Sequence, residues 1–243
     1  MTAMYTEERV SALNERFAGS SPENLLRWAI GEFFPDIALA SSFGLEDVAL
    51  IDMVWRINPM VEVFTLDTGR LNEETYEVME KIRDRYGIRI VSYFPDREAT
   101  ERLEKEDGFY SFRKSVDARK LCCHIRKVEP LGRALKSLKA WITGLRREQA
   151  VTRGSAQMVE IDQGHHGMIK LSPLVDWTEA DVRAYVGAKE IPYNALHNQG
   201  YPSIGCAPCT RAIKAGEHVR AGRWWWENPE TKECGLHPAK AAP

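Results

Sequence analysis

The sequence predicts an α/β fold in which a parallel β-sheet is covered by helices. Short apolar runs alternate with segments whose apolar residues recur at helical spacing. Several of the apolar runs are followed directly by small or charged residues, as at the carboxyl ends of strands in sheets that bind ligands. A chain of 243 residues can bury one substantial core. We therefore expect a single domain over residues 1–243.

The composition indicates a soluble cytoplasmic protein. Charged residues make up 28% of the chain, hydrophobic residues make up 44%, and the formal net charge is −2, which is ordinary for a globular protein. This balance does not indicate a nucleic-acid binder. The first residues do not form a signal peptide, and no apolar run reaches the length of a membrane span. We expect a cytoplasmic protein without nucleic-acid or membrane partners.

The first half of the chain predicts alternating helices and strands. Pro22 suits the first turn of a helix, with Ser20 and Ser21 before it as cap candidates. Gly87 ends a later helix in the position of a C-terminal cap. The expected elements are helices at 6–17 and 23–34, a strand at 37–40, a helix from 48, a strand at 61–66, a helix at 72–86 and a strand at 88–93.

The second half predicts the remaining strands and helices. Residues 97–138 are mostly helical and charged, with Cys122 and Cys123 at the start of a helix that continues through Leu135. The Thr-x-x-Asp start of the last helix is close to a capping box. After residue 138 we expect a strand at 140–144, a hairpin at the sheet edge formed by 157–162 and 167–171, and a helix at 178–189.

Two loops follow strands where an anion could bind. Residues 41–47 (Ser-Ser-Phe-Gly-Leu-Glu-Asp) lie before a helix whose free amides attract phosphate, and a plain turn explains them equally well. The glycine-lysine pair of a Walker loop is absent. Residues 67–70 end the next strand, where the alternative is a capped turn with a solvated arginine. The candidate ligand-binding residues of the two loops are Ser41, Ser42, Glu46, Asp47, Thr68 and Arg70.

A third loop carries three arginines directly after a strand, namely Arg146, Arg147 and Arg153. The planar guanidinium donates two parallel hydrogen bonds to phosphate or sulfate oxygens. Three such groups at one strand end favour anion binding over a solvated surface. Arg146 and Arg153 therefore join the candidate ligand-binding residues.

Four of the five cysteines form two pairs, Cys122-Cys123 and Cys206-x-x-Cys209. In a reducing compartment, paired cysteines are metal ligands or redox catalysts more often than disulfides. Four thiolates suit tetrahedral zinc or a 4Fe-4S cube. Adjacent cysteines are awkward ligands for one zinc and are tolerated on the faces of a cube, so the spacing favours the cluster only slightly.

The fifth cysteine, Cys234, is left over from the two pairs. Basic residues close to it in the sequence are Arg220, Arg223, Lys232 and His237. Positive charge lowers the pKa of a thiol and so favours the thiolate, which is the nucleophilic form. The alternative is an incidental cysteine near a frayed terminus, and this segment alone does not exclude it.

Six motifs between Ile37 and His237 resemble, in unbroken order, those of the assimilatory sulfonucleotide reductases. They are residues 41–47, 66–71, 122–127 (Cys-Cys-His-Ile-Arg-Lys), 142–147, 201–211 and 232–237 (Lys-Glu-Cys-Gly-Leu-His). The last two motifs are highly specific. One departure is Ala150, where the family usually has serine, and it affects one minor polar contact.

The resemblance implies a fold of the adenine nucleotide alpha-hydrolase (PP-loop) type. It also implies reduction of adenosine 5'-phosphosulfate (APS) to sulfite and AMP in sulfate assimilation and cysteine biosynthesis. Family members that use the 3'-phosphorylated substrate (PAPS) without a cluster lack the paired cysteines. This chain has all four, so it is similar to the 4Fe-4S branch that prefers APS. Use of both substrates, or of PAPS, is the alternative, because tolerance of a 3'-phosphate depends on pocket shape.

The resemblance also implies roles for single residues. The implied ligands of one 4Fe-4S cluster are Cys122, Cys123, Cys206 and Cys209. The implied catalytic residues are Cys234 as nucleophile, Lys127 between cluster and substrate, and His237. Arg220 and Arg223 would contact the phosphosulfate.

The implied mechanism begins with attack of the Cys234 thiolate on the sulfur of the bound sulfate. AMP departs and a cysteine S-sulfonate remains on the enzyme. An external dithiol then releases sulfite, and thioredoxin or glutaredoxin is implied because no such domain is fused to the chain. Residues from about 219 to 243 are expected to move, since Cys234 must meet first the substrate and then the partner. The cluster is expected to position and polarise the site, and homo-oligomerisation is left open.

Two other classes of protein account for part of the pattern. An ATP-consuming adenylating or thiolating enzyme could carry a cluster, but residues 41–47 lack the Ser-Gly-Gly-x-Asp-Ser form of such enzymes. A zinc-stabilised binding module without catalysis would account for the four paired cysteines. Analysis of iron and acid-labile sulfide separates the zinc module from a cluster enzyme.

Overall fold

The structure is a computed structural model that describes residues 5–150, 153–228, 232, 235 and 236. The chain divides into two compact units. The first unit contains residues 1–64, 78–91 and 137–193, and the second contains 65–77, 92–136 and 194–243. Contacts between residues are concentrated within each of these two units. The expectation of a single domain over residues 1–243 stays a prediction.

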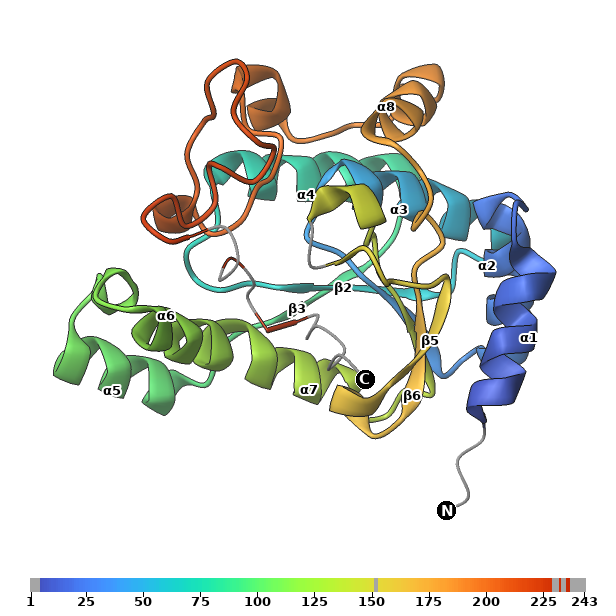
Figure 1. The fold of residues 1–243 in the computed structure, drawn as a ribbon, viewed down its shortest axis with the longest axis horizontal. Helices are drawn as coiled ribbons and strands as arrows, with labels where there is room; N and C mark the ends of the chain where they lie inside the picture. The colour runs from blue at the N-terminus through green and yellow to red at the C-terminus, as the bar shows by residue number, and fades with distance from the viewer. Residues whose placement is uncertain (1–4, 151–152, 229–231, 233–234, 237–243) are drawn as a thin grey trace. The chain divides into compact units, whose positions relative to one another are not determined.

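A six-stranded sheet has the strand order β3-β2-β1-β4-β6-β5 (Figure 1). The strands are β1 (Ile37–Ala40), β2 (Glu62–Leu66), β3 (Ile90–Tyr93), β4 (Ala140–Ile142), β5 (Val159–Asp162) and β6 (Met168–Leu171). Strand β1 is parallel to β2 and β4, and β4 is parallel to β6. Only the β5–β6 pairing among those described is antiparallel. The predicted parallel sheet with an edge hairpin is confirmed.

Helix α1 (Glu7–Phe17) covers the edge strand β5. The Asn14 side chain donates to the Val159 carbonyl oxygen at 2.9 Å, and its Oδ1 accepts from the Val159 amide at 3.0 Å. One side chain thus pairs with both backbone groups of an edge residue. Such covering protects an edge strand from pairing with another chain.

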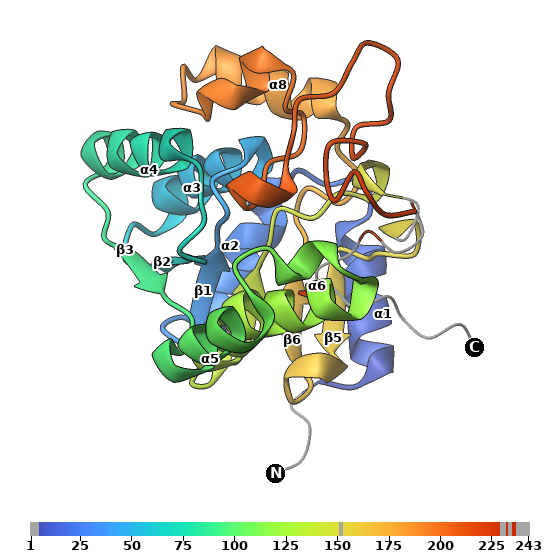
Figure 2. The same cartoon turned by 90° about the vertical axis from the view of Figure 1, so that its left-hand side faces the viewer.

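Helix α3 (Leu45–Ile57) lies at the centre of the first unit. It packs against α2 (Pro22–Phe33), α8 (Glu179–Ala188) and strand β1. Its residues from Asp47 to Val54 are all buried, because a helix covered on several sides must be apolar around most of its circumference. Figure 2 shows α3 beside α2.

Local signals for helix ends are largely confirmed. Pro22 occupies the first turn of α2, although the Ser21 side chain makes no capping bond. Helix α4 (Glu73–Tyr86) is followed by Gly87 with φ of 63°, a left-handed conformation that glycine adopts without a steric cost. Thr178 and Asp181 form a reciprocal capping box at the start of α8.

One expectation about the second unit is wrong. Cys122 and Cys123 lie at the end of α6 (Val116–Cys123), not at the start of a helix. A π-helical turn, η2 (His124–Val128), then leads into α7 (Glu129–Leu135). Pro130 lacks an N–H and its ring crowds the preceding turn, so a regular helix from Cys122 to Leu135 is disfavoured.

The other helical elements of the second unit are short, apart from α5 (Arg97–Asp107). They are the 3-10 turns η1 (Ser111–Arg113), η6 (Ala195–Gln199) and η7 (Ala207–Cys209). Turn η7 holds the Cys206-x-x-Cys209 pair beside the loop after β2, where the Ala207 amide donates to the Arg70 carbonyl oxygen. The second unit therefore depends on loops and side-chain contacts more than on long regular elements.

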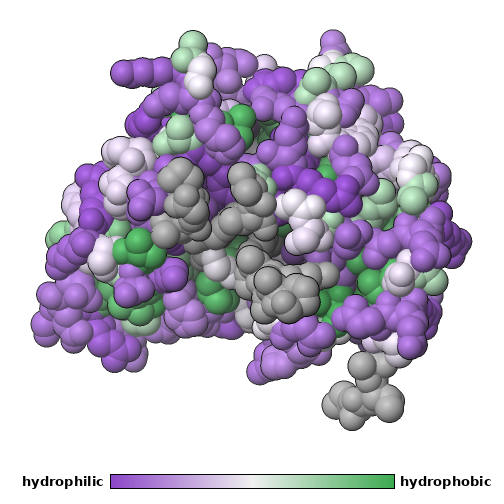
Figure 3. Space-filling view, in the orientation of Figure 1, coloured by the Kyte–Doolittle hydropathy of each residue, from purple (hydrophilic) through white to green (hydrophobic). Residues whose placement is uncertain are grey.

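The face drawn in Figure 3 is mostly hydrophilic, with small hydrophobic patches separated by polar side chains. Small separate patches are normal for a protein surface in contact with water. In the part of the chain that the structure describes, no helix has the length and apolar character needed to cross a membrane.

Candidate active site

The four paired cysteines line one cavity in the second unit. Their exposed fractions are 7% for Cys122 and Cys123 and 8% for Cys206 and Cys209. All four belong to one hydrophobic cluster that also contains Leu103, Phe112 and Trp224. The cavity wall includes these cysteines together with Arg70, Arg119, Arg126 and Lys127. Two cysteine pairs separated by about 80 residues in the sequence thus meet at one buried place.

Backbone hydrogen bonds hold the Cys206-x-x-Cys209 turn in place. The Ala207 amide donates to the Arg70 carbonyl oxygen at 2.8 Å, and the Asn72 side chain donates to the Gly205 carbonyl oxygen at 3.1 Å. On the other side, the Trp224 amide donates to the Cys209 carbonyl oxygen at 3.1 Å. The loop after β2 and the C-terminal segment therefore both fix this cysteine pair.

Thr68, a predicted substrate contact, lies against a cysteine. Its hydroxyl is 3.3 Å from the Cys206 sulfur, and its carbonyl oxygen accepts from Arg126 at 2.7 Å. Arg126 and Arg70 both donate to Glu104, at 2.6 Å and 2.9 Å. Arg70 thus lines the cysteine cavity, and Thr68 contacts one of its cysteines. A contact of either residue with substrate stays a prediction.

The cationic wall affects the cysteines unequally. Burial raises the pKa of the Cys206 thiol, but Lys127, the Thr68 hydrogen bond and nearby arginines outweigh it, so the net pKa is lowered. Burial raises the pKa of Cys209 to about 12, and the adjacent Cys206 adds to the increase. Four buried thiolates close together are therefore stable only with further positive charge.

The donor set is compatible with an iron-sulfur cube. Among the described residues, no group of three or more His, Cys, Asp or Glu side chains is arranged to hold one ion. Tetrahedral zinc needs four sulfurs about 2.3 Å from one point, whereas each thiolate of a 4Fe-4S cube binds a different iron. The buried Trp224 Nε1 and Arg126 Nε atoms have no hydrogen-bond partner among the residues that the structure describes, and both residues line the cavity. Such donors suit the sulfur atoms of a cluster.

Trp224 lies at the centre of a group of arginines. It is 1% exposed and has φ of 40°, an uncommon backbone conformation for a bulky residue. The guanidinium carbons of Arg223, Arg119 and Arg220 lie 4.6, 4.7 and 5.9 Å from its ring centroid. The negative face of an indole ring attracts such cations. Trp224 is therefore a packing anchor of the second unit.

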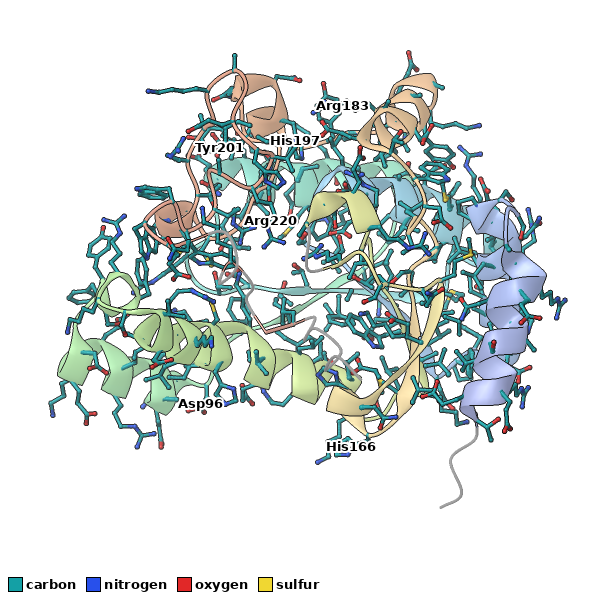
Figure 4. The ribbon with its side chains drawn as sticks, in the orientation of Figure 1. Asp96, His166, Arg183, His197, Tyr201 and Arg220 are labelled. Atoms are coloured by element: carbon teal, nitrogen blue, oxygen red, sulfur yellow. The ribbon has the colours of Figure 1, made fainter. Side chains whose placement is uncertain are left out.

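Arg220 and Arg223, the predicted phosphosulfate contacts, are both 8% exposed. Arg220, labelled in Figure 4, donates to the Lys232 carbonyl oxygen at 2.7 Å. Arg223 donates to the Ile204 carbonyl oxygen at 3.2 Å, and it passes so close to Gly205 that a Cβ there would lie 2.3 Å from Nη2. Both arginines hold loops of the second unit, and their contact with substrate stays a prediction.

The loop after β1 is held by its own side chains in the first unit. The Ser42 amide and hydroxyl donate to Asp47 Oδ2 at 2.6 and 2.7 Å, and Ser41 Oγ accepts from the Phe43 amide at 3.1 Å. Burial raises the pKa of Asp47 from 3.8 to about 6, although the Ser42 hydrogen bonds oppose it. Because the charged form is disfavoured in the fold, Asp47 contributes less to stability as the pH rises from about 4 to about 6.

Gly144, directly beyond strand β4, allows this loop to approach closely. A Cβ at position 144 would lie 2.4 Å from Asp47 Oδ1 and 2.9 Å from Glu46 Cβ. Real Cβ atoms do not make such contacts, so any larger residue must displace the loop. Glycine at this position is therefore required by packing and not by backbone conformation.

Replacing Gly144 with alanine should destabilise the protein by about 1 to 3 kcal/mol, the usual cost of overpacking. Chemical denaturation monitored by circular dichroism measures the change. The control is Gly187→Ala in α8, where nothing lies within 4 Å of the added Cβ and alanine should stabilise the helix by about 0.5 to 1 kcal/mol. Equal stability of the two variants would contradict the close approach.

The arginines of the third loop are paired with nearby acids and amides. Arg146 Nε donates to Glu46 and Nη1 donates to Glu148, both at 2.8 Å. Arg153 donates to Gln149, which also accepts from the Arg146 amide at 3.1 Å. This brings the predicted residues Glu46 and Arg146 together within the first unit. Among the described residues, the Arg146 side chain forms its hydrogen bonds through Nε and Nη1, so Nη2 can donate to an anion without loss of either carboxylate.

The predicted site residues thus fall into two groups in different compact units. Ser41, Ser42, Glu46, Asp47, Arg146 and Arg153 belong to the first unit. Thr68, Arg70, Lys127, Arg220, Arg223 and the four paired cysteines belong to the second. Cys234 and His237 lie outside the described residues, so their catalytic roles stay predictions.

Sequence reasoning missed Glu104, Arg119, Arg126 and Glu227, which hold the cavity walls. Arg126 stands in the Cys-Cys-His-Ile-Arg-Lys run, and Arg119 precedes Cys123 by one helical turn, so their spacing was a usable signal. Glu104 and Glu227 are far from the cysteines in the sequence. Nothing in their local sequence distinguishes them from surface acids.

The comparison with protein families decides which family this is. The Phosphoadenosine phosphosulfate reductase domain matches residues 36–212, a span that contains the loop after β1, the arginine loop and the four paired cysteines. The chain belongs to this family. The predicted resemblance to the sulfonucleotide reductases is confirmed.

Relatives of the reductase resemble it over most of their length. The chain is 53% identical over 207 residues to the adenosine 5'-phosphosulfate reductase of Allochromatium vinosum, covering 85% of this chain and 80% of the relative. It is 50% identical over 214 residues to that of Burkholderia cepacia, covering 88% and 85%. A match of this extent shows a shared family and not only a shared fold.

Solved structures confirm the predicted fold class. The phosphoadenylyl-sulfate reductase of Candida auris superposes with a TM-score of 0.73 at 31% identity, covering 86% of this reductase and 98% of that chain. The FMN adenylyltransferase of Candida glabrata has a TM-score of 0.56 at 16% identity, covering 100% and 82%. The second likeness concerns the fold alone.

Proposed function

We propose that this chain reduces adenosine 5'-phosphosulfate to sulfite and AMP. The observation that carries the proposal is the buried cavity lined by Cys122, Cys123, Cys206 and Cys209 in a member of a reductase family. Relatives at 53% and 50% identity are named adenosine 5'-phosphosulfate reductases. This assignment places the chain in assimilatory sulfate reduction.

In the first step, the Cys234 thiolate attacks the sulfur of the bound sulfate group. A sulfur–sulfur bond forms, the bond from that sulfur to the bridging oxygen breaks, and AMP leaves with the electron pair. The product on the enzyme is a cysteine S-sulfonate. An anion attacks a polyanion here, so cationic groups must offset the developing charge. Candidates are Lys127, Arg146, Arg153, Arg220 and Arg223.

In the second step, a thiolate of an external dithiol attacks the Cys234 sulfur. The bond to the sulfonate group breaks, and sulfite leaves with the electron pair. The second thiol of the partner then resolves the mixed disulfide and restores Cys234. The dithiol supplies both electrons, and we assign this role to a thioredoxin or glutaredoxin because its two thiols balance the reaction.

The four cysteines of the cavity would hold a 4Fe-4S cluster. When bound, the cluster would offset the negative charge of the four thiolates and polarise the site. It need not supply electrons, because the external dithiol supplies both. Lys127 lines the same cavity and lowers the pKa of Cys206 despite burial. Because Lys127 lines this cavity, we assign it a role toward both the cluster site and a nearby anion.

Intact mass measurement tests the proposal most directly. Anaerobically purified protein is incubated without reductant with APS or with PAPS, and the mass is followed with time. We expect a sulfonate adduct on one cysteine, formed faster with APS. Addition of thioredoxin should remove the adduct and release one sulfite per adduct.

The same experiment also distinguishes use of APS from use of PAPS or of both substrates. Equal rates with APS and PAPS would assign a dual reductase, and a faster rate with PAPS would overturn the APS assignment. No adduct with either substrate, from protein that carries its iron and sulfide, would overturn the reductase mechanism. Release of pyrophosphate from ATP would then support the ATP-consuming alternative.

A further inference from the structure

A buried ion pair joins the cysteine-bearing helix to the C-terminal segment. Arg119 Nε and Nη2 donate to the two carboxylate oxygens of Glu227 at 2.8 and 2.9 Å. The side chains are 0% and 3% exposed. The two parallel bonds fix the orientation of both groups as well as their distance.

The pair lies between two parts of the site. Arg119 is on α6, one helical turn before Cys123, and its guanidinium lies 4.7 Å from the Trp224 ring centroid. Glu227 belongs to the same turn as Trp224, since its amide donates to the Trp224 carbonyl oxygen at 2.9 Å. The Trp224 amide in turn donates to the Cys209 carbonyl oxygen at 3.1 Å. Both ends of the ion pair therefore contact elements that carry cavity cysteines.

The energetics indicate positioning more than stabilisation. Removing two charges from water costs about as much as their attraction returns, so a buried pair adds little net stability. Truncating one partner is nevertheless costly, because the other charge stays buried and uncompensated. A buried pair with two parallel bonds thus permits one arrangement of its two segments and disfavours others.

Arg119 also faces a cavity cysteine. Its guanidinium belongs to a residue that lines the cavity together with Cys122 and Cys123. The same guanidinium donates both of its bonds to the Glu227 carboxylate of the C-terminal segment. The cavity wall and this part of the segment are therefore joined through one side chain.

We propose that the Arg119–Glu227 pair positions residues 224–228 relative to the helix that bears Cys122 and Cys123. Glu227 precedes Cys234 by seven residues, which span at most about 25 Å. Fixing position 227 thus restricts where Cys234 can reach. Arg119 and Glu227 are positioning residues, and their effect on sulfur transfer rests on the proposed function.

The test compares Glu227→Gln with wild type by two independent measurements. Amide hydrogen exchange of residues 224–236 should be at least about fivefold faster in the variant, with exchange in α1 to α3 unchanged. The single-turnover rate of sulfonate formation should fall at least about tenfold, while the APS concentration for half-maximal rate changes less than about threefold. Iron and sulfide per chain should stay at the wild-type level.

The matched control is Glu217→Gln, which breaks another two-bond ion pair in the second unit. Arg211 donates to Glu217 at 2.9 and 3.0 Å, but these side chains are 35% and 32% exposed. Exposed pairs restrict a segment weakly, so neither measurement should change. If Glu227→Gln does not fold, Arg119→Lys decides, since it keeps the charge and loses the two parallel bonds.

If residues 224–236 of the folded Glu227→Gln protein exchange their amide hydrogens at the wild-type rate, the proposal is overturned. A fall in sulfonate rate that only tracks loss of iron would also overturn it, since the pair would then act on cavity stability alone. Absence of a sulfonate adduct in the wild type would instead contradict the proposed function. The exchange measurement would still decide whether the pair positions the segment.

Discussion

Replacing Cys234 with serine should abolish the sulfonate adduct and lower turnover by on the order of 10⁴- to 10⁶-fold, the loss seen when a nucleophile is removed. A serine hydroxyl stays protonated near neutral pH, whereas a thiol beside basic groups forms the reactive thiolate. Intact mass after incubation with APS, without reductant, measures the adduct. Peptide mapping then assigns the modified cysteine in the wild type.

The interpretation needs folded protein with an intact cavity. Cys234→Ser should match the wild type in circular dichroism and in iron content, because the four predicted cluster ligands are Cys122, Cys123, Cys206 and Cys209. An adduct on Cys234→Ser at the wild-type rate would show that another group accepts the sulfonate. That result would reject Cys234 as the nucleophile while leaving the family assignment intact.

Replacing Cys209 with serine should remove the iron and sulfide of the purified protein, from about four of each per chain to near zero. Cys209 is 8% exposed inside the hydrophobic cluster that holds the other three cysteines. A serine oxygen is a harder ligand than a thiolate and fits iron-sulfur chemistry poorly. Colorimetric iron and sulfide analysis of anaerobically purified protein measures the loss.

Cys234→Ser is the matched control for Cys209→Ser. Both exchange one sulfur for one oxygen. Cys209 lines the cavity and is a predicted cluster ligand, whereas Cys234 is predicted to be the nucleophile, so only the loss of Cys209 should remove iron. Zinc at about one per chain in the wild type, with no acid-labile sulfide, would contradict the cluster. That result would favour the alternative of a zinc-stabilised binding module, in which the four paired cysteines bind zinc.

Periodicity and local turn chemistry were enough to predict most of the fold. The alternation around residues 37–40 and 61–66 corresponds to strands β1 and β2, and the Thr178 cap marks the start of α8. These features depend on neighbours in the sequence, through side-chain spacing and backbone preference. The expected helix start at Cys122 and Cys123 was wrong because the Ser115 side chain caps a helix that begins at Val116 and ends at Cys123.

The candidate site was also predictable only in part. The spacing and motifs indicated that Cys122, Cys123, Cys206 and Cys209 form a set. Clusters and metals that bind four thiolates can be inferred from the number and spacing of cysteines. Their meeting in one cavity, and the Thr68 hydroxyl beside Cys206, appear only in the folded chain. These contacts join residues more than 80 positions apart.

The ion pairs depended entirely on tertiary structure. Glu104 and Glu227 have the local sequence of surface acids, yet one accepts from two cavity arginines and the other is buried against Arg119. Residue type and spacing thus determined the elements, the family motifs and the cysteine set. Which charges are buried together was decided by the packing of distant segments, because charge pairing and desolvation depend on distances in space and not on order along the chain.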